Sequence, residues 1–270
     1  MSNLLLRVLV AAVGAPLLIY LAVHGSWPLL ALVIMIQAGI LWEWRRLCAI
    51  HGVNISVPVV AVSAALADWA VFAGDWSVGA VLIPLAAGIL FFAEVFRHDR
   101  RPLANLGGSA LFLLYVALPL VMWTKFSSTP GAASFGSAGP LAALLLTTWM
   151  CDTGAYFIGR ALGKHKLYPA ASPNKTIEGA IGGVVFAAVV LPIMTALGWA
   201  NPRALDFVAL PLIVSVIGQS GDLLESLMKR EVQVKDTSAI LPGHGGFLDR
   251  FDSLLLSTPF FLAYLHLMMG

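Results

Sequence analysis

The sequence predicts an all-α fold: a polytopic integral membrane protein of about nine transmembrane helices, with the N-terminus cytoplasmic and the C-terminus outside. Of the 270 residues, 59% are hydrophobic and 11% are charged, whereas about a quarter of the residues of a soluble protein are charged. The apolar residues come in repeated runs of about 20, the length that an α-helix needs to cross a bilayer core. A soluble protein with an unusually large core does not explain these runs.

The apolar runs divide into about nine ranges, and Gly, Pro, Asn or Ser marks most of the gaps between them. The ranges are 4–23, 27–47, 57–73, 77–96, 103–124, 140–161, 177–199, 207–227 and 251–269. We divide the chain into 1–125, with about five of these helices, and 126–270, with about four. No A-x-A-like cleavage site follows the first apolar run, so we expect a retained first helix.

The basic residues test this topology, because cytoplasmic loops carry an excess of Lys and Arg. Of the 16 basic residues, only Lys125 and Arg203 fall in gaps on the side opposite the N-terminus. An incorrect helix count would scramble this asymmetry. The two longest polar connections, 160–176 and 229–250, both face the cytoplasm in this topology.

Composition and motifs exclude several classes of function. Cys48 and Cys151 form no CxxC pair, and the histidines form no HExxH motif, which argues against a disulfide framework and against zinc. The formal net charge of +2 gives no reason to expect nucleic acid as a partner. Residues 218–222 resemble a nucleophile elbow but end in Asp, and residues 159–165 are one residue short of a P-loop. Covalent catalysis therefore has no support.

One charged stretch near a helix end has a simple interpretation. Trp42, Trp44, Arg45 and Arg46 are typical of an interfacial aromatic and basic anchor. The i, i+3 spacing lets Glu43 pair with Arg46 on the same helix face.

Asp152 and Asp222 are different, because both lie within apolar runs. Asp152 precedes Arg160 by about 12 Å of helix, and Asp222 precedes Lys229 by about 10 Å. An acid at that depth is costly unless it faces a polar cavity, so a functional role is the first hypothesis and a buried structural pair is the alternative. Their similar depth suggests one shared cavity.

The most polar segment, residues 226–252, lies between two apolar runs. Asp249 and Asp252 are three residues apart, so their carboxylates point the same way if Asp249 begins the last helix. With Asp222 they are candidate ligands for Mg²⁺, which prefers carboxylate oxygens together with phosphates and water. Asp236 is a further candidate ligand, or it holds Lys235.

The same segment contains a Pro-Gly-His-Gly-Gly turn and several basic residues. The glycines, including Gly245 and Gly246, let backbone N–H groups approach an anion, and His244 can donate beside them. Basic side chains next to metal-binding acids are the composition expected of phosphoryl or nucleotidyl transfer. These side chains are Lys229, Arg230, Lys235 and Arg250.

A second cytoplasmic segment, SPNKTIEG at residues 172–179, leads into an apolar run. Thr176 is a candidate N-cap for that helix. Lys175 beside the helix N-terminus would make an anion site. A plain basic anchor at the membrane surface is the alternative.

Residues 226–252 resemble the signature of the phosphatidate cytidylyltransferase (CDP-diacylglycerol synthase) family. In that signature, S-x-hydrophobic-K-R-x4-K-D is followed by P-x-H-G-G-x2-D-R-hydrophobic-D. The matching residues are Ser226, Lys229, Arg230, Lys235, Asp236, Ser238, Pro242, His244, Gly245, Gly246, Asp249, Arg250 and Asp252. Asp152, Tyr156, Gly159 and the 172–179 segment are also similar to the family, so the resemblance covers about the C-terminal half.

The resemblance implies a bacterial cytoplasmic (inner) membrane enzyme of phospholipid biosynthesis, with its catalytic site in 126–270. It would condense CTP with phosphatidic acid to give CDP-diacylglycerol and pyrophosphate, and it would use Mg²⁺. Dimers would be unsurprising for this family.

The resemblance also implies roles for individual residues. Asp222, Asp249, Asp252 and Asp236 would share Mg²⁺ and any second cation, and Gly245 and Gly246 would cradle pyrophosphate. Catalytic candidates are Lys229, Arg230, Lys235, His244 and Arg250, and substrate-binding candidates are Asp152, Tyr156, Ser172, Pro173, Lys175, Thr176 and Ser226.

Two other classes of function are alternatives. A transporter would also have intramembrane acids, but it should show paired half-helices or repeated halves. A CDP-alcohol phosphotransferase would need D-x3-D and DG-x2-AR elements, whereas this chain has the shorter spacing of Asp249 and Asp252.

Overall fold

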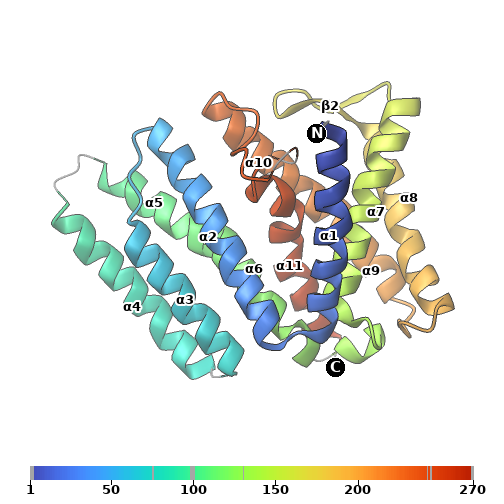
Figure 1. The fold of residues 1–270 in the computed structure, drawn as a ribbon, viewed down its shortest axis with the longest axis horizontal. Helices are drawn as coiled ribbons and strands as arrows, with labels where there is room; N and C mark the ends of the chain where they lie inside the picture. Colours follow the sequence, from blue (N-terminus) through green and yellow to red (C-terminus); the bar gives the residue numbers. More distant parts are fainter. Residues whose placement is uncertain are drawn as a thin grey trace.

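The apolar runs of the sequence form long helices that lie side by side, with the loops gathered at two ends (Figure 1). The computed structural model describes residues 3–74, 76–97, 101–129, 131–241, 243 and 245–268. The N-terminal elements are α1 (Asn3–His24), α2 (Ser26–Ile50), α3 (Val57–Ala73), α4 (Trp76–Val95), α5 (Pro102–Phe112), the π-helical η1 (Leu113–Ala117), α6 (Leu118–Met122), and the 3₁₀ segments η2 (Trp123–Ser128) and η3 (Ala132–Phe135). The C-terminal elements are α7 (Gly139–Leu162), β1 (Lys166–Tyr168), β2 (Ser172–Thr176), α8 (Ile177–Ala196), α9 (Asp206–Leu212), the π-helical η4 (Ile213–Gly218), α10 (Gln219–Glu231) and α11 (Leu248–Leu267).

Within the described residues, 5 helices or helical runs are long and apolar enough to cross a membrane. They are Ser26–Ile50, Pro102–Ser128, Gly139–Leu162, Ile177–Ala196 and Asp206–Glu231, and shorter apolar helices cover Ala12–His24, Val57–Ala73 and Leu85–Val95. The fold is thus that of an all-α membrane protein. The larger number of crossings and the orientation of the termini stay predictions, although α1 begins and α11 ends at opposite ends of the helices (Figure 1).

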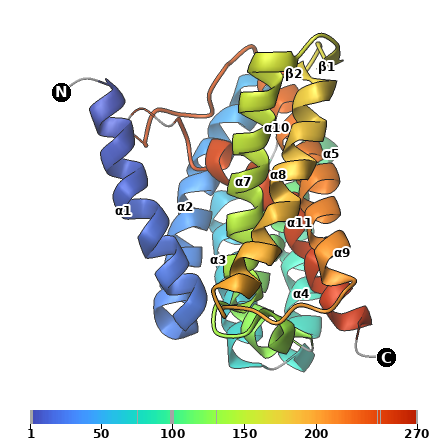
Figure 2. The ribbon, with the colours of Figure 1, turned by 90° about the vertical axis from the view of Figure 1, so that its right-hand side faces the viewer.

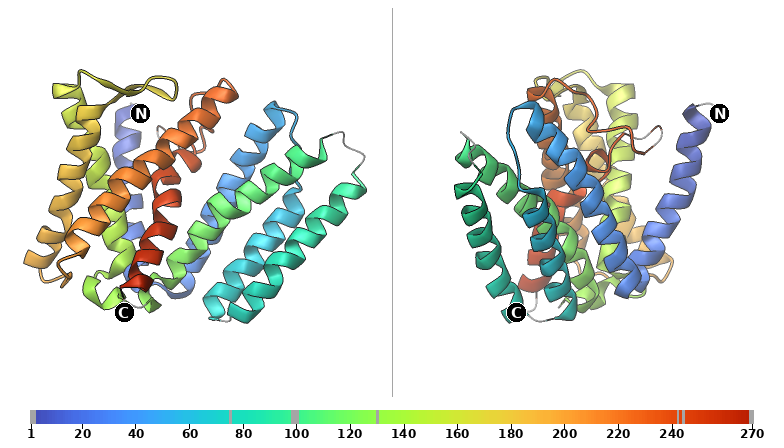
Figure 3. Two further views of the ribbon diagram at one scale, coloured as in Figure 1. Left: turned by 180° about the vertical axis from the view of Figure 1, so that it is seen from behind. Right: turned by 60° about the vertical axis from the view of Figure 1, so that its left-hand side comes forward.

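The helices form two groups joined by α11. Seen from behind, α3 and α4 lie on one side and α8 with α9 on the other, while α11 runs between α6 and α10 (Figure 3). Helix α1 leans away from the other helices and packs against α7 and α2 (Figure 2). The division expected at residue 125 falls inside η2, and α11 contacts helices on both sides of it.

Aromatic side chains hold the far end of α11 against the preceding segments. Trp123 donates its indole N–H to Thr258 Oγ1 at 3.0 Å. Phe261 lies 5.6 Å from Phe126 and 5.5 Å from Phe135 between ring centroids. Because aromatic pairs bury large areas in defined geometries, this cluster fixes where α11 sits between the two groups.

The anchor expected around residue 43 forms only in part. The guanidinium of Arg46 lies 4.6 Å from the centroid of the Trp42 ring, as a basic and aromatic anchor requires. The side chain of Glu43 is instead buried and is engaged by Thr237 and Ser238, far along the chain. These contacts take the place of the expected Glu43–Arg46 pair.

Helices α7 and α8 pack at very short range because glycines face each other along their contact. A Cβ at Gly154 would collide with Phe186, and a Cβ at Gly182 would collide with Ile158. Small residues let two helix backbones approach closely where no solvent drives them together. The sequence between 151 and 183 therefore sets a narrow interface next to Asp152, the acid of α7.

We predict that Gly182→Ala destabilises the protein by about 1–3 kcal/mol, because the new methyl group overpacks the α7–α8 contact. Thermal unfolding in detergent micelles measures the change. Gly107→Ala is the matched control, since a Cβ there meets nothing within 4 Å. Equal unfolding curves for the two variants would contradict the close-packing argument.

Candidate active site

Three carboxylates from two packed helices come together near the start of α11. Asp222 and Glu225 lie on α10 and Asp252 lies in the first turns of α11, and one oxygen of each lies within 4.8 Å of the others. Ser226 supports the group by donating its hydroxyl to Asp222 at 3.4 Å. Like charges this close repel each other unless a cation lies among them. Carboxylate oxygens at this separation suit a hard divalent cation such as Mg²⁺.

A short β-hairpin brings a lysine to the edge of this group. Strand β1 pairs with β2 in antiparallel fashion, and β2 leads directly into α8. Lys175 on β2 forms an ion pair with Asp222 of α10. Thr176 is the N-cap of α8, as predicted, and its hydroxyl accepts a hydrogen bond from the N–H of Gly179 at 3.1 Å.

Glu178 ties the base of the hairpin to the first turn of α8. Its carboxylate accepts hydrogen bonds from the backbone N–H of Lys164 at 3.0 Å and of His165 at 3.2 Å. It also lies 2.6 Å from Nδ1 of His165. These contacts fix the hairpin, and with it Lys175, over the end of α7.

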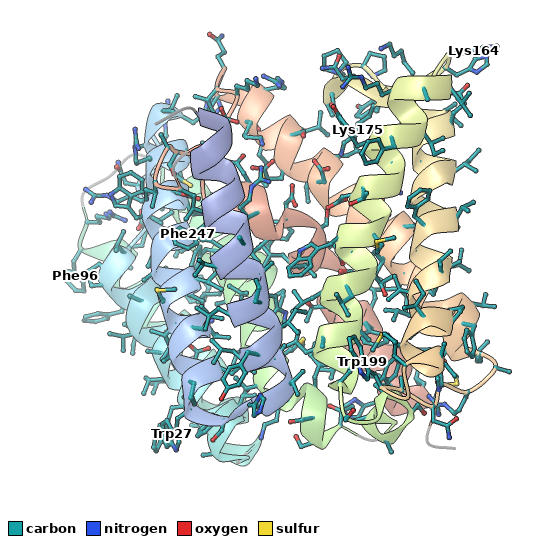
Figure 4. The ribbon with its side chains drawn as sticks, turned by 45° about the vertical axis from the view of Figure 1, so that its right-hand side comes forward. Trp27, Phe96, Lys164, Lys175, Trp199 and Phe247 are labelled. Carbon is teal, nitrogen blue, oxygen red and sulfur yellow. The ribbon has the colours of Figure 1, made fainter. Side chains whose placement is uncertain are left out.

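A cavity of about 590 Å³ opens under the hairpin beside the carboxylates. Its lining residues are Asp152, Ala155, Tyr156, Gly159, Arg160, Leu167, Asn174, Lys175, Thr176, Gly179, Ala180, Gln219 and Asp222. The shared cavity predicted for Asp152 and Asp222 is thus confirmed. Lys175 and Lys164 lie at the hairpin end of the molecule, whereas Trp27 and Trp199 lie toward the opposite end (Figure 4).

A buried ammonium group links the carboxylates to Asp249 in the first turn of α11. Nζ of Lys229 lies 2.5 Å from Glu225 Oε2 and 2.6 Å from Asp249 Oδ1. Glu225 and Lys229 lie four residues apart on α10, a spacing that places both side chains on one helix face. Asp249 also accepts hydrogen bonds from the N–H of Thr237 at 3.0 Å and of Gly246 at 2.8 Å.

These donors change the acidity of Asp249. Burial by itself raises the pKa of Asp249, but the ammonium of Lys229 and the N–H groups of Gly246 and Thr237 outweigh burial and hold that pKa at about 2. Asp249 lies outside the group of three carboxylates. The two acids expected to point the same way therefore have different surroundings, because Lys229, Thr237 and Gly246 occupy the oxygens of Asp249.

Comparison with known proteins identifies the family of this chain. The model of the cytidylyltransferase family matches residues 5–268. The chain belongs to the cytidylyltransferase family. A protein of Bacillus subtilis (strain 168) named phosphatidate cytidylyltransferase is 51% identical over 112 residues, 42% of this chain and 42% of the relative.

Two further relatives carry the same printed name. The protein of Staphylococcus haemolyticus (strain JCSC1435) is 50% identical over 114 residues, 42% of this chain and 44% of the relative. The protein of Staphylococcus aureus (strain COL) is 50% identical over 115 residues, with the same two shares. The aligned region thus spans less than half the length of these relatives.

In this cytidylyltransferase-family chain, several other predicted site residues lie outside the cavity lining. Lys235, Asp236 and Arg250 are exposed. Arg230 is also exposed and donates to the carbonyl of Val234 at 3.3 Å.

The predicted residues of the two turns are placed differently. Ser172 and Pro173 lie on β2 at the hairpin turn, outside the cavity lining. Gly245 has a φ of 86°, and Gly246 is buried with its N–H donated to Asp249. His244 and Pro242 lie outside the described residues.

Two residues with a place in the site were not singled out from the sequence. Glu225 completes the carboxylate group, and its spacing of three residues from Asp222 was the available signal. Arg160 lines the cavity and donates to the hydroxyl of Tyr156 at 2.9 Å, and the i, i+4 spacing of these two residues on α7 was the signal.

We predict that Lys229→Met lowers the free energy of unfolding by about 3–5 kcal/mol, because it leaves buried carboxylates without their cation. Chemical denaturation in micelles measures the loss. Adding Glu225→Gln to the variant should restore part of the stability by removing one charge. Lys235→Met is the exposed control and should change stability by less than about 0.5 kcal/mol. A Lys229→Met variant as stable as this control would refute the charge network.

The low pKa of Asp249 predicts a dependence of stability on pH. A carboxyl whose pKa is lower in the folded than in the unfolded protein stabilises the fold above the unfolded value, and this contribution disappears as the pH falls through the folded value. Between pH 5 and pH 2 the free energy of unfolding of the native chain should fall by about 2 kcal/mol more than that of Asp249→Asn. Equal losses of unfolding free energy in the two proteins would show that Lys229 does not hold Asp249 ionised.

Proposed function

We propose that the chain transfers CMP from CTP to phosphatidic acid, giving CDP-diacylglycerol and pyrophosphate. The observation that carries this proposal is the group of Asp222, Glu225 and Asp252, in which Asp222 pairs with Lys175 and also lines the cavity. Relatives that carry the name phosphatidate cytidylyltransferase support the choice of nucleotide and lipid.

The residues present fit a divalent cation. Three carboxylates offer oxygens within 4.8 Å of one another, and the cavity lined by Asp222 leaves room for phosphate oxygens and water. Asp222 and Asp252 would hold Mg²⁺, with Glu225 completing the set, and any second cation would share these oxygens. When bound, Mg²⁺ would neutralise phosphate charge and polarise the reacting phosphorus.

The chemistry of the transfer requires little from the protein beyond position and charge. A phosphate oxygen of phosphatidic acid forms a bond to the α-phosphorus of CTP, while the bond from that phosphorus to the bridging oxygen breaks. Pyrophosphate leaves with the electron pair. The lipid phosphate is already ionised near neutral pH, so no general base is needed.

Basic side chains around the cavity would orient the two anionic substrates. Lys175 would release Asp222 to the cation and neutralise phosphate charge, and Arg160 beside Tyr156 would contribute a second cationic group. Exposed Arg230, Lys235 and Arg250 would draw CTP toward the same end. Lys229 would act indirectly, since it is already paired with Glu225 and Asp249.

The proposed setting is the bacterial cytoplasmic (inner) membrane, with the hairpin end facing the cytoplasm. Soluble CTP would reach the cavity from that end and the lipid from the bilayer. The distribution of Lys and Arg along the sequence supports this orientation. A homodimer is part of the same proposal, on the family resemblance alone.

The test is pyrophosphate release by the purified protein in detergent with phosphatidic acid, Mg²⁺ and either CTP or ATP. We predict release with CTP only, loss of release on chelation of Mg²⁺, and a fall in kcat of at least about 100-fold for Asp222→Asn. Glu231→Gln is the control, since its side chain is 69% exposed. Activity that survives in Asp222→Asn would move the cation site elsewhere. No release with either nucleotide from folded protein would refute the proposal and favour the transporter alternative.

A further inference from the structure

Glu43 of α2 reaches the signature segment, residues 237–248, across almost the whole length of the chain. Its Oε1 accepts hydrogen bonds from the hydroxyl of Ser238 at 2.6 Å and the N–H of Phe247 at 2.8 Å. Its Oε2 accepts hydrogen bonds from the hydroxyl of Thr237 at 3.0 Å and the N–H of Leu248 at 2.9 Å. One carboxylate thus holds both ends of the segment.

Glu43 places a carboxylate at the N-terminus of α11, where a capping side chain is missing. Leu248 begins α11, and no side chain within the helix caps its N-terminus. Free N–H groups at a helix start favour an anion, and hydrogen bonds to an ionised acceptor are stronger than neutral ones. Glu43 is 0% exposed, so these donors meet the charge in place of water.

The backbone around this contact is shaped to admit it. A Cβ at Gly246 would collide with the carboxylate of Glu43 and the hydroxyl of Thr237. One helical turn before Glu43, a Cβ at Gly39 would lie 2.6 Å from the ring of Phe247. Both glycines therefore let α2 and the signature segment come into direct contact.

From Glu43 a continuous set of contacts leads to the carboxylate group of the cavity. The hydroxyl of Thr237 also lies 2.9 Å from Asp249 Oδ2, and it can donate its proton to one carboxylate at a time. Asp249 in turn holds Lys229, which pairs with Glu225. A shift of the segment at Glu43 would therefore move the ammonium group that neutralises Glu225.

We propose that Glu43 is a positioning residue, which holds the signature segment so that Asp249 and Lys229 keep Glu225 in the cation-binding group. The part of this proposal that concerns catalysis rests on the proposed function. The part that concerns the segment rests on the contacts of Glu43 alone. Glu43 itself touches neither the cavity lining nor the three carboxylates among the described residues.

The test compares Glu43→Gln with the native chain, because the amide keeps the shape but turns one acceptor into a donor. We expect faster amide hydrogen exchange at Phe247 and Leu248, a kcat at least about tenfold lower, and a Mg²⁺ concentration for half-maximal rate raised about threefold or more. A loss of folded protein alone lowers the rate without moving the Mg²⁺ dependence. That dependence therefore separates positioning from stability.

Glu94→Gln is the matched control, since Glu94 is a mostly buried carboxylate of the same half that accepts from Asn105 at 2.6 Å. It should leave exchange in the signature segment and the Mg²⁺ dependence unchanged. Ser238→Ala is a milder second variant that removes one donor to Glu43. Its effect on kcat should not add to that of Glu43→Gln, because the two side chains are in direct contact and act through the same segment.

The outcomes separate this proposal from the proposed function. Amide hydrogen exchange at the native rate in residues 237–248 of Glu43→Gln would overturn the role of Glu43. So would effects of Glu43→Gln and Ser238→Ala on kcat that simply add. An unchanged Mg²⁺ dependence would likewise overturn it. If the native chain releases no pyrophosphate, the proposed function fails, while hydrogen exchange still decides whether Glu43 holds the segment.

Discussion

Charge buried among apolar helices is stable only where donors or opposite charges meet it, and this constraint organises the polar end of the molecule. Glu43, Asp249, Lys229 and Glu225 satisfy one another through a continuous series of contacts that includes Thr237. Each of these charged side chains would be costly to bury without its partners. Together they attach the signature segment to α2 and to α10, and they bring the start of α11 next to Asp222.

The two helix groups depend on α11 for their relative placement. Its first turn is held by Glu43, and its far end is held by the aromatic contacts of Phe261 and the hydrogen bond to Thr258. The helix therefore carries Asp252 at a position that both groups determine. This explains why a site formed mainly by the C-terminal half includes a support from the N-terminal half.

The second wall of the cavity has a different physical basis. Helices α7 and α8 approach through glycines, and the hairpin between them is fixed by Thr176 and Glu178 at the first turn of α8. These local contacts keep Lys175 within reach of Asp222. The unit formed by α7, the hairpin and α8 is thus held by local contacts, whereas α10 and α11 are held by contacts between distant segments. The cavity lies where Lys175 of the hairpin meets Asp222 of α10.

The sequence alone determined the features that arise from local spacing. Runs of apolar residues predict the helices, the i, i+4 spacing predicts the pair of Glu225 and Lys229, and Thr176 is recognisable as an N-cap because its partner lies three residues away. The depth of Asp152 and Asp222 also predicts their shared cavity. Residue spacing carries this information because helix geometry is regular.

Only the tertiary structure decided how the acids divide their roles. Asp249 and Asp252 have the spacing of neighbours on one helix face, yet Lys229 and the signature segment hold Asp249 while Asp252 joins Asp222 and Glu225. Glu43 could not be assigned from its neighbours in sequence, because its partners lie 194 to 205 residues away. Hydrogen bonds between segments so far apart depend on how the helices pack, and local periodicity contains no record of that packing.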